Sequence, residues 1–238
     1  MRTTNCQRRP HVMKKKAVVT ITAAAMAFGI VAGVSAAPVL EKISAQLNWS
    51  IKFQVNGKEW KAQDSAGNKL APITYGGTTY LPVRAVAIAL GTAVEYDSKN
   101  QTIYLGEKSS TTPITSDKIK LSYSSMSTKD KQYTVQGGVD YGSGIVLDDL
   151  NSAAKSFELQ PENKYQKLDL KVFVLNVEGE IDVKVYDDSD IVLKHVKLSA
   201  QDKIQDISVD IGGSKSIRIE GKTPVFDKGK IFVTGNYR

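Results

Sequence analysis

The sequence has few of the residues on which catalytic and metal sites most often depend. Its 238 residues include one cysteine and two histidines. A single cysteine excludes an intramolecular disulfide framework and any zinc or redox site built on a CxxC pair. The sequence also has no G-x-S-x-G segment, which would mark a hydrolase nucleophile. These absences argue against several common classes of enzyme.

The first 36 residues have the layout of a secretory signal peptide. Residues 1–16 hold six basic residues and no acidic one, residues 17–34 are uncharged, and small residues follow at Val34-Ser35-Ala36. This layout predicts cleavage after Ala36. The alternative is a retained membrane anchor, because 18 uncharged residues are just long enough to span a bilayer. Met13 is an alternative start, since the three lysines after it already supply the positive segment.

Export changes the charge of the chain. The whole sequence has 32 basic and 25 acidic residues, a net charge of +7. Cleavage leaves 26 basic against 25 acidic residues, a net charge of +1, and it removes Cys6 and His11. A nearly neutral chain without a helix-turn-helix, zinc-finger or RNP-like pattern is not expected to bind nucleic acid. Contact with a membrane is expected only through the signal segment, if that segment stays uncleaved.

Composition divides the exported part into two modules. Residues 109–132 are rich in Ser, Thr and Lys, and they predict a linker or an irregular lead-in. The first module then covers residues 37–108 and the second covers residues 133–238. Residues 37–132 have 12 basic and 8 acidic side chains, whereas residues 133–238 have 14 and 17. Neither excess is large enough to identify a partner.

The first module has the pattern of a small α+β domain. Asn56-Gly57 and Gly76-Gly77 each lie between short alternations of apolar and polar residues, and they predict tight hairpin turns. Pro82 then begins a short helix and Gly91 ends it. A last hairpin follows, with its turn at 97–100. The helix residues expected to face the sheet are Val83, Val86, Ala87 and Leu90.

The segment from Gly77 to Asp97 resembles the copper amine oxidase N-terminal-like (stalk) domain. It begins Gly-Thr-Thr-Tyr-Leu-Pro-Val-Arg and continues through an Ala- and Leu-rich helix, Gly91 and Val-Glu-Tyr-Asp. With the opening at Val55 and the end at Gly106, the resemblance covers about residues 44–107. It implies a secreted or cell-wall-associated protein of a Gram-positive bacterium. It does not imply copper chemistry, because a three-histidine copper site is impossible with one exported histidine.

The second module has the pattern of an all-β, jelly-roll-like sandwich. Apolar and polar residues alternate over Leu168–Val174, Ile181–Val185, Ile207–Ile211 and Ile217–Ile219, and turn signals separate these runs. Together with Lys155-Ser-Phe and Lys164-Tyr165, these runs are similar to the NPCBM family of carbohydrate-binding modules. The resemblance implies glycan binding. The Gly-Asp-Gly turn of that family appears here as Asp187-Asp188-Ser189.

Candidate ligand-binding residues of the second module are aromatic and acidic residues near predicted loops. Sugar binding needs an exposed ring for stacking beside polar groups for the hydroxyls. The residues expected to supply these groups are Tyr141, Tyr165, Phe226, Tyr237, Asp187 and Asp188.

The acidic cluster Asp187, Asp188 and Asp190 has two interpretations. Three carboxylates within four residues could contribute to a calcium site. We favour a polar hairpin turn, because Asp and Ser are common turn residues and the EF-hand spacing is absent. No copper site and no other cofactor is expected.

The sequence therefore predicts a multi-domain, secreted or cell-surface protein that has no catalytic site and binds glycan or cell-wall polymer through the second module. His195 alternates with apolar residues in a predicted strand and is expected on its solvent-exposed face. The alternative function is a structural or assembly protein of the envelope, whose sandwich would present a contiguous apolar patch to another protein. An enzyme of unfamiliar type would need convergent acids in a cleft.

We expect the secreted form of the protein to begin at Ala37, because the small-residue exit precedes that position. Intact-mass spectrometry of the culture medium measures this directly. Recovery of a full-length chain in the membrane fraction alone would contradict cleavage and would show that the segment is an anchor.

Overall fold

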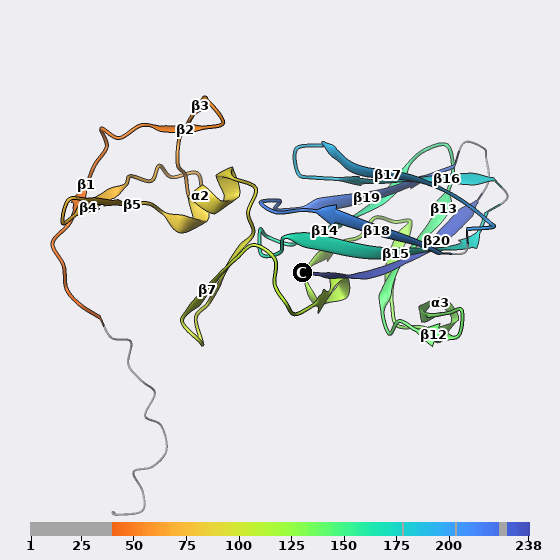
Figure 1. Ribbon diagram of the computed structural model, residues 1–238. Coiled ribbons are helices and arrows are strands. Elements are labelled where there is room, and N and C mark those ends of the chain that lie inside the picture. The colour runs from red at the N-terminus through yellow and green to blue at the C-terminus, as the bar shows by residue number, and fades with distance from the viewer. Residues whose placement is uncertain (1–39, 178, 203, 224–227) are drawn as a thin grey trace, which may run out of the picture. The chain divides into compact units, whose positions relative to one another are not determined.

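Strands make up most of the regular secondary structure in the computed structural model, which describes residues 40–177, 179–202, 204–223 and 228–238 (Figure 1). The predicted signal peptide, residues 1–36, and Phe226 lie outside the described residues. Ala45–Arg238 forms one compact unit. Among the described residues, no helix is both long and apolar enough to cross a membrane.

The first module contains the three hairpins that the sequence predicts. They are β2 (Phe53–Val55) with β3 (Lys58–Trp60), β4 (Ile73–Tyr75) with β5 (Thr78–Tyr80), and β6 (Val94–Asp97) with β7 (Thr102–Leu105). A further short strand, β1 (Gln46–Leu47), pairs with β4. The turn residues have the backbone conformation that the sequence requires, since φ is +50° at Asn56 and +76° at Gly57. Positive φ at both positions is what a tight two-residue hairpin turn needs.

The helix α2 (Val83–Ala89) begins after Pro82, as predicted, and ends before Gly91, where φ is +67°. Its buried face agrees with the prediction at Ala87 but not at Val83 and Leu90. Ala85 and Ala87 are buried, whereas Val83 and Leu90 are 41% and 61% exposed. Because this short helix carries apolar residues on more than one face, the apolar spacing alone could not identify the face that packs.

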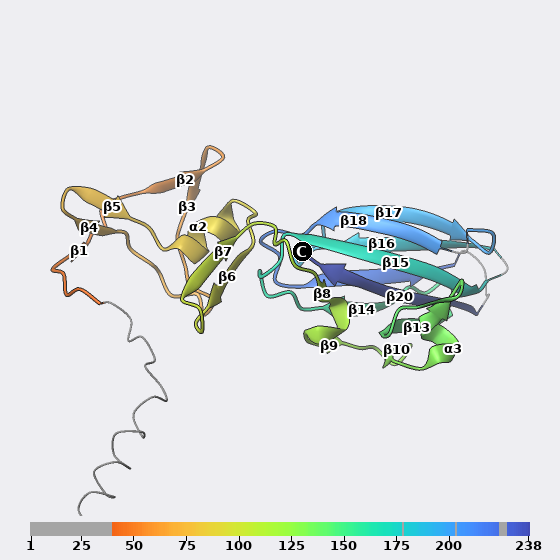
Figure 2. The same cartoon turned by 60° about the horizontal axis from the view of Figure 1, so that its bottom comes forward.

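The second module is a sandwich of two antiparallel sheets (Figures 1 and 2). The six-stranded sheet consists of β10 (Ser125–Thr128), β13 (Gly144–Leu150), β20 (Gly229–Tyr237), β15 (Lys167–Asn176) and β18 (Ile204–Asp210) in that order, with β8 (Thr112–Pro113) beside β20. The five-stranded sheet consists of β17 (Val192–Ser199), β16 (Glu180–Tyr186), β19 (Ile217–Lys222), β14 (Lys155–Leu159) and β9 (Ile119–Lys120).

Alternate residues of the two sheets fill the space between them. In β15, Leu168, Leu170 and Val172 are at most 1% exposed, and in β16, Ile181 and Val183 are fully buried. These residues belong to one continuous apolar cluster to which both sheets contribute. Side chains of a strand point alternately to its two faces, so the predicted period of two corresponds to one face in the core and one in solvent.

The segment 109–132, which the sequence predicts to be a linker or lead-in, contributes strands to both sheets. Its strand β8 pairs with β20, β9 pairs with β14, and β10 pairs with β13. Ile114, in the short 3₁₀ turn Ile114–Ser116, is buried in the core. Strands of two to four residues are too short to show an alternating pattern, and their position depends on partners far along the chain.

Tyr165 and Tyr237 lie in the core and do not face a ligand. They are 5% and 0% exposed, and their rings stack with centroids 4.5 Å apart and planes 8° from parallel. The interpretation of these two residues as sugar-stacking platforms is therefore wrong: both are near chain turns, yet their rings point between the sheets. Burial, followed by the nearby Asp117 carboxyl, raises the pKa of Tyr165 to about 12, and burial also raises the pKa of Tyr237.

We expect the free energy of unfolding to fall as the pH rises from about 10 to about 12. In the unfolded chain a tyrosine ionises near pH 10, whereas Tyr165 stays neutral in the fold up to about 12. The stabilisation is complete below the unfolded pKa and is lost as the pH approaches the folded pKa, because only the unfolded state releases its proton in between. Urea unfolding at about pH 8 and about pH 11 measures this difference. Tyr165→Phe should reduce the pH dependence, and an unchanged dependence in that variant would contradict the assignment.

Candidate functional site

A groove crosses the outer face of the six-stranded sheet. It encloses about 680 Å³ and lies over β18, β15 and β20, with the chain just before β13 at its rim. We call it the sheet groove. The polar side chains that line it are Tyr141, Ser143, Asp169, Lys171, Asp206, Ser208, Thr234, Asn236 and Arg238.

Strand register places these side chains in rows. The residues directly opposite one another across three strands are Ser208, Asp169 and Asn236 in one row, and Asp206, Lys171 and Thr234 in the next. Along each strand, the residue of one row is two positions from the residue of the other row, and both therefore point to the same face. All six side chains lie on the face of the sheet away from the core. The groove is therefore an array of carboxylate, ammonium, amide and hydroxyl groups at cross-strand spacing.

Asp169 is the most connected residue of the array. Its Oδ1 accepts a hydrogen bond from Ser208 Oγ at 2.6 Å, and its Oδ2 accepts one from Arg238 Nε at 2.6 Å. Burial pushes the pKa of Asp169 up, but the hydrogen bonds from Arg238 and Ser208 outweigh it and hold the pKa below its ordinary value. Arg238 is itself held by Glu107, whose Oε1 lies 2.7 Å from Nη1. Asp169 is therefore a fixed, ionised acceptor.

The neighbouring row contains an ion pair. Lys171 Nζ lies 2.6 Å from Asp206 Oδ1. The hydrogen bond to Asp206 raises the pKa of Lys171, against a smaller opposing effect of burial. Thr234 Oγ1 donates to the carbonyl oxygen of Ser143 at 2.8 Å. This hydrogen bond links the chain before β13, at the rim of the groove, to β20 in its floor.

Asn236 is a polar side chain of the groove whose hydrogen-bonding capacity is unused, as is that of the Tyr141 hydroxyl among the described residues. Within the residues that the structure describes, its side-chain amide has no hydrogen-bond partner in the protein, although it is half-buried. An amide offers two donors and one acceptor. The amide atoms are open to solvent in the groove, so this amide is available to a hydrogen-bonding group of a ligand.

Tyr141 forms an aromatic wall at the rim. It belongs to an excursion made of α3 (Lys131–Thr134), β11 (Val135–Gln136) and β12 (Val139–Asp140), which precedes β13. Its ring packs on Phe173 with centroids 5.0 Å apart, and Phe173 belongs to a small apolar cluster on this outer face with Val146 and Phe232.

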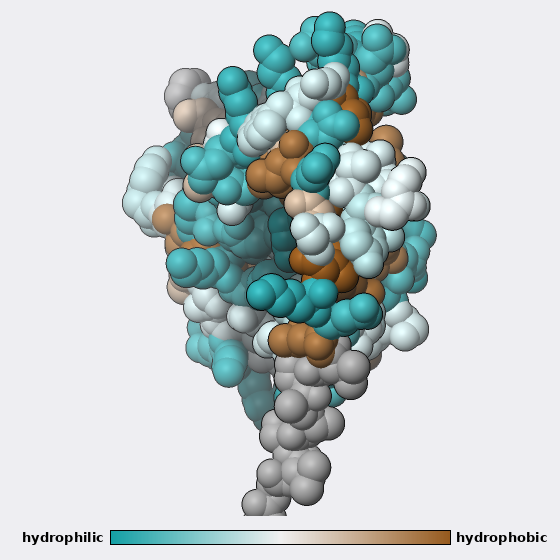
Figure 3. Space-filling view, turned by 90° about the vertical axis from the view of Figure 1, so that its left-hand side faces the viewer, coloured by the Kyte–Doolittle hydropathy of each residue, from teal (hydrophilic) through white to brown (hydrophobic). Residues whose placement is uncertain are grey.

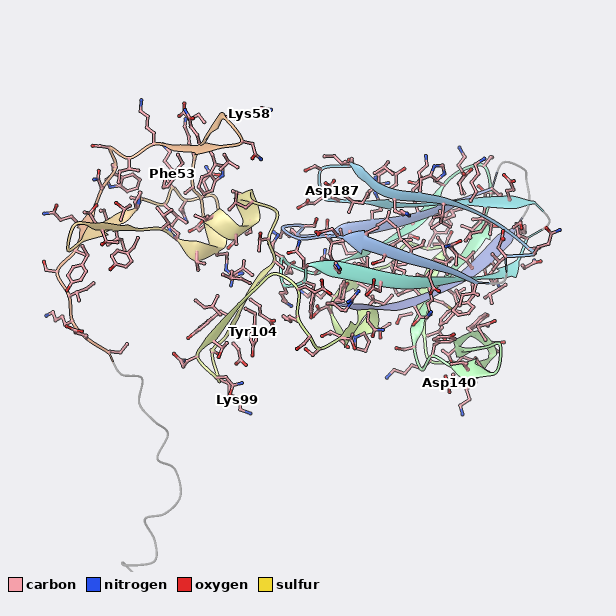
Figure 4. All side chains as sticks on the ribbon, viewed as in Figure 1. Phe53, Lys58, Lys99, Tyr104, Asp140 and Asp187 are labelled. Atoms are coloured by element: carbon pink, nitrogen blue, oxygen red, sulfur yellow. The ribbon has the colours of Figure 1, made fainter. Side chains whose placement is uncertain are left out.

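The turn that presents Tyr141 is fixed by Asp140, labelled in Figure 4. The Oδ1 atom of Asp140 accepts hydrogen bonds from the backbone N–H of Gly142 at 2.8 Å and from Thr134 Oγ1 at 3.0 Å. These bonds, led by the one from Gly142, lower the pKa of Asp140. Of the predicted aromatic candidates among the described residues, Tyr141 is thus the one that reaches a groove.

The predicted Asp187 lies in the turn between β16 and β17 (Figure 4). Its Oδ1 accepts hydrogen bonds from the backbone N–H groups of Ser189 and Ile191, at 2.9 and 2.8 Å. This is the local arrangement by which Asp stabilises a turn.

The other two carboxylates of the cluster turn to different partners. Asp188 Oδ2 accepts from the backbone N–H of Lys215 at 3.2 Å, and Asp190 Oδ1 lies 2.5 Å from Arg218 Nη2. Within the described part of the chain, no group of three or more His, Cys, Asp or Glu side chains lies close enough to hold a metal ion. The geometry matches the favoured turn interpretation rather than convergence on calcium.

His195 lies on β17, on the exposed face of the five-stranded sheet, as predicted. Its Nε2 is 2.8 Å from Asp182 Oδ1, and the two side chains are 41% and 30% exposed. A histidine paired with a carboxylate would need a nucleophile within reach to act as a base. No hydrogen bond joins this histidine to a hydroxyl or thiol among the described residues.

Residues 54–139 match the family model described as the copper amine oxidase N-terminal domain. This match confirms the resemblance found in the sequence, and it extends beyond residue 108, the predicted end of the first module. A comparison with curated protein sequences found no match.

Among solved structures, the chain is similar to carbohydrate-binding modules of the CBM51 type. One is CBM51-2 with the INT domains of Clostridium perfringens ZmpB, in complex with GlcNAc: the TM-score is 0.43 at 13% identity, over 62% of this chain and 38% of that one. Another is CBM51 of Clostridium perfringens GH95 in complex with methyl-galactose, with a TM-score of 0.41 at 14% identity, over 54% of this chain and 100% of that one. This chain therefore spans less than half of the first structure.

We expect Tyr141→Ala to lower the free energy of unfolding by roughly 1–3 kcal/mol, because it removes a half-buried ring from Phe173. Tyr141→Phe keeps the ring and should change the free energy by less than about 0.5 kcal/mol. Urea unfolding of the two variants beside the wild type measures both. Equal losses in the two variants would contradict a packing role for the ring.

Proposed function

We propose that the chain is an exported glycan-binding protein that holds a saccharide in the sheet groove. The observation that carries this proposal is the unpaired amide of Asn236, which lies in one row with the fixed carboxylate of Asp169. A saccharide presents adjacent hydroxyls, each both donor and acceptor, and such a row of acceptor and donor groups can bind them pairwise.

The aromatic wall supports the same ligand class. Polar groups alone would bind a hydroxyl-rich ligand with little net gain, because each bond replaces one to water. A ring that covers the apolar face of a sugar adds burial to the polar contacts. Tyr141 stands at the rim in a fixed orientation, since Asp140 and Phe173 hold its turn and its ring.

The charges of the groove favour a neutral or weakly charged saccharide. Asp169 is paired with Arg238 and Lys171 with Asp206, so the groove has no uncompensated charge among these four residues. The groups are preorganised by their own hydrogen bonds, which lowers the ordering cost of binding. The Ser208 hydroxyl does contact a carboxylate, that of Asp169, but Arg238 also holds this carboxylate and its pKa is lowered, which makes it a weak base. The proposal is therefore of binding without a reaction.

A second candidate function is contact with another envelope protein through the first module. The outer faces of the sandwich carry polar hollows rather than the apolar patch that this alternative predicts for them. Exposed apolar residues gather instead around a hollow of about 380 Å³ in the first module, where Leu47, Trp49, Tyr80 and Leu81 are 45–64% exposed. Figure 3 looks toward this module and shows apolar patches among hydrophilic side chains.

A glycan array with the full secreted chain tests the main proposal. We expect retention on at least one neutral glycan, and a loss of roughly tenfold in affinity for Asn236→Ala, which removes the free amide. Tyr141→Ala should also weaken binding, because it removes the wall. The matched control is Lys120→Gln, whose side chain pairs with Glu158 on the other sheet and should leave affinity unchanged. Retention on no glycan, or full affinity in both groove variants, would contradict the proposal.

A further inference from the structure

A second hollow lies on the outer face of the five-stranded sheet, away from the sheet groove. It encloses about 460 Å³ over β17, β16 and β19. We call it the lysine hollow. The charged or titratable residues that line it are Asp182, Lys184, His195, Lys197, Glu220 and Lys222.

The pairing register of β17, β16 and β19 places lysine ammonium groups from all three strands around the hollow. Asp182 of β16 is directly opposite Lys197 of β17 on one side and Lys222 of β19 on the other. In the next row, Lys184 is directly opposite His195 and Glu220. Side chains opposite or diagonal to one another on one sheet face lie within reach of a shared ligand.

The carboxylates of this face already have partners. Glu220 Oε2 lies 2.9 Å from Arg218 Nη1, and its Oε1 accepts a hydrogen bond from the Tyr186 hydroxyl at 3.4 Å. Arg218 is held in turn by the Tyr186 ring, 4.2 Å from its centroid. Asp182 Oδ1 is bonded to His195 Nε2. The acidic groups of the hollow are therefore engaged elsewhere or with the histidine.

The lysines are left without matching carboxylates. Lys197 makes one loose contact, 3.5 Å from Glu180, with both side chains more than 60% exposed, and such an exposed pair contributes little. Lys184 and Lys222 have no ion pair and no hydrogen bond from their ammonium groups within the described part of the protein. The module as a whole has more acidic than basic residues, 17 against 14. Lysines gathered without partners on an otherwise acidic module point to an anionic ligand.

We propose that the lysine hollow binds a phosphate or sulfate ester carried by an anionic polysaccharide. Two or three ammonium groups can donate charge-assisted hydrogen bonds to the oxygens of one such group. The second site does not depend on the sheet groove, since the two lie on different sheets.

The lining of the hollow favours a polysaccharide over a nucleic acid. Single-stranded nucleic acids are held by stacking of bases on aromatic rings. Among the described residues no Phe, Tyr or Trp lines the hollow, and the imidazole of His195 is hydrogen-bonded to Asp182. Asp182 and Glu220 would repel a continuous phosphate backbone, whereas Asp182 Oδ2, which has no partner among the described residues, can accept a sugar hydroxyl beside an isolated ester.

The experiment uses the full secreted chain and two immobilised polymers, dextran sulfate and neutral dextran of the same length. We expect retention on dextran sulfate that weakens as salt is added, because the charges are exposed and screened, and no comparable retention on dextran. The double variant Lys184→Gln/Lys222→Gln should lose about tenfold or more in affinity for dextran sulfate. Lys120→Gln is the matched control, because that lysine lies on the same sheet but is already paired with Glu158.

Three results would overturn the proposal. They are no retention of the wild type on dextran sulfate, an equal loss in Lys120→Gln, and equally strong retention of single-stranded DNA that the double variant abolishes. The last result would show that the lysine hollow binds polyanions in general and does not select an anionic polysaccharide. Urea unfolding of the double variant confirms that it is folded, and Asn236→Ala should keep its affinity for dextran sulfate, so that failure of this site and failure of the glycan groove are distinguishable.

Discussion

The pairing of β15 with β18 on one side and β20 on the other is the constraint on which the rest of the sandwich depends. Pairing of β15 with a neighbour on each side in fixed register brings its residues Leu168, Leu170 and Val172 to the core face together. The same register brings Asp169 and Lys171 to the outer face, each opposite a polar residue on both sides. A shift of one residue would exchange the two sets and would bury the charges. The core therefore stabilises the arrangement of the groove.

The two outer faces differ in how their charges are compensated. On the six-stranded sheet, Asp169 and Lys171 each have an opposite charge within 2.6 Å, and an uncharged amide is left free. On the five-stranded sheet, the carboxylate of Glu220 is taken by Arg218, and two ammonium groups are left over. The free amide on the six-stranded sheet suits hydroxyl groups, and the free ammonium groups on the five-stranded sheet suit an oxyanion. Both faces arise from the same alternation of core-facing and solvent-facing side chains along the strands.

Local signals in the sequence were sufficient for several of the long strands, though not for β13, and for the tight turns. The alternation around Leu168–Val174 and Ile181–Val185 and the Asn56-Gly57 pair correspond to β15, β16 and a hairpin in the structure. Tyr141 is also a predicted candidate, because it is an aromatic residue among glycines. The other groove residues could not be predicted, since Asn236 and Asp169 become neighbours only through pairing of β15 with β20. Proximity to a turn likewise could not show that the rings of Tyr165 and Tyr237 stack inside the core.

The strands between residues 112 and 128 determine where an independently folding sandwich can begin. Both β9 and β10 are edge strands, so a shortened chain that starts at residue 133 would leave β13 and β14 with open edges in both sheets. It would also leave a void where Ile114 fills the core. Open edges are templates for pairing with other chains, and natural proteins cover or shorten them. A truncation that follows the composition of the sequence would therefore cut through the domain and favour aggregation, whereas a boundary ahead of Thr112 keeps β10 paired with β13 and β9 paired with β14.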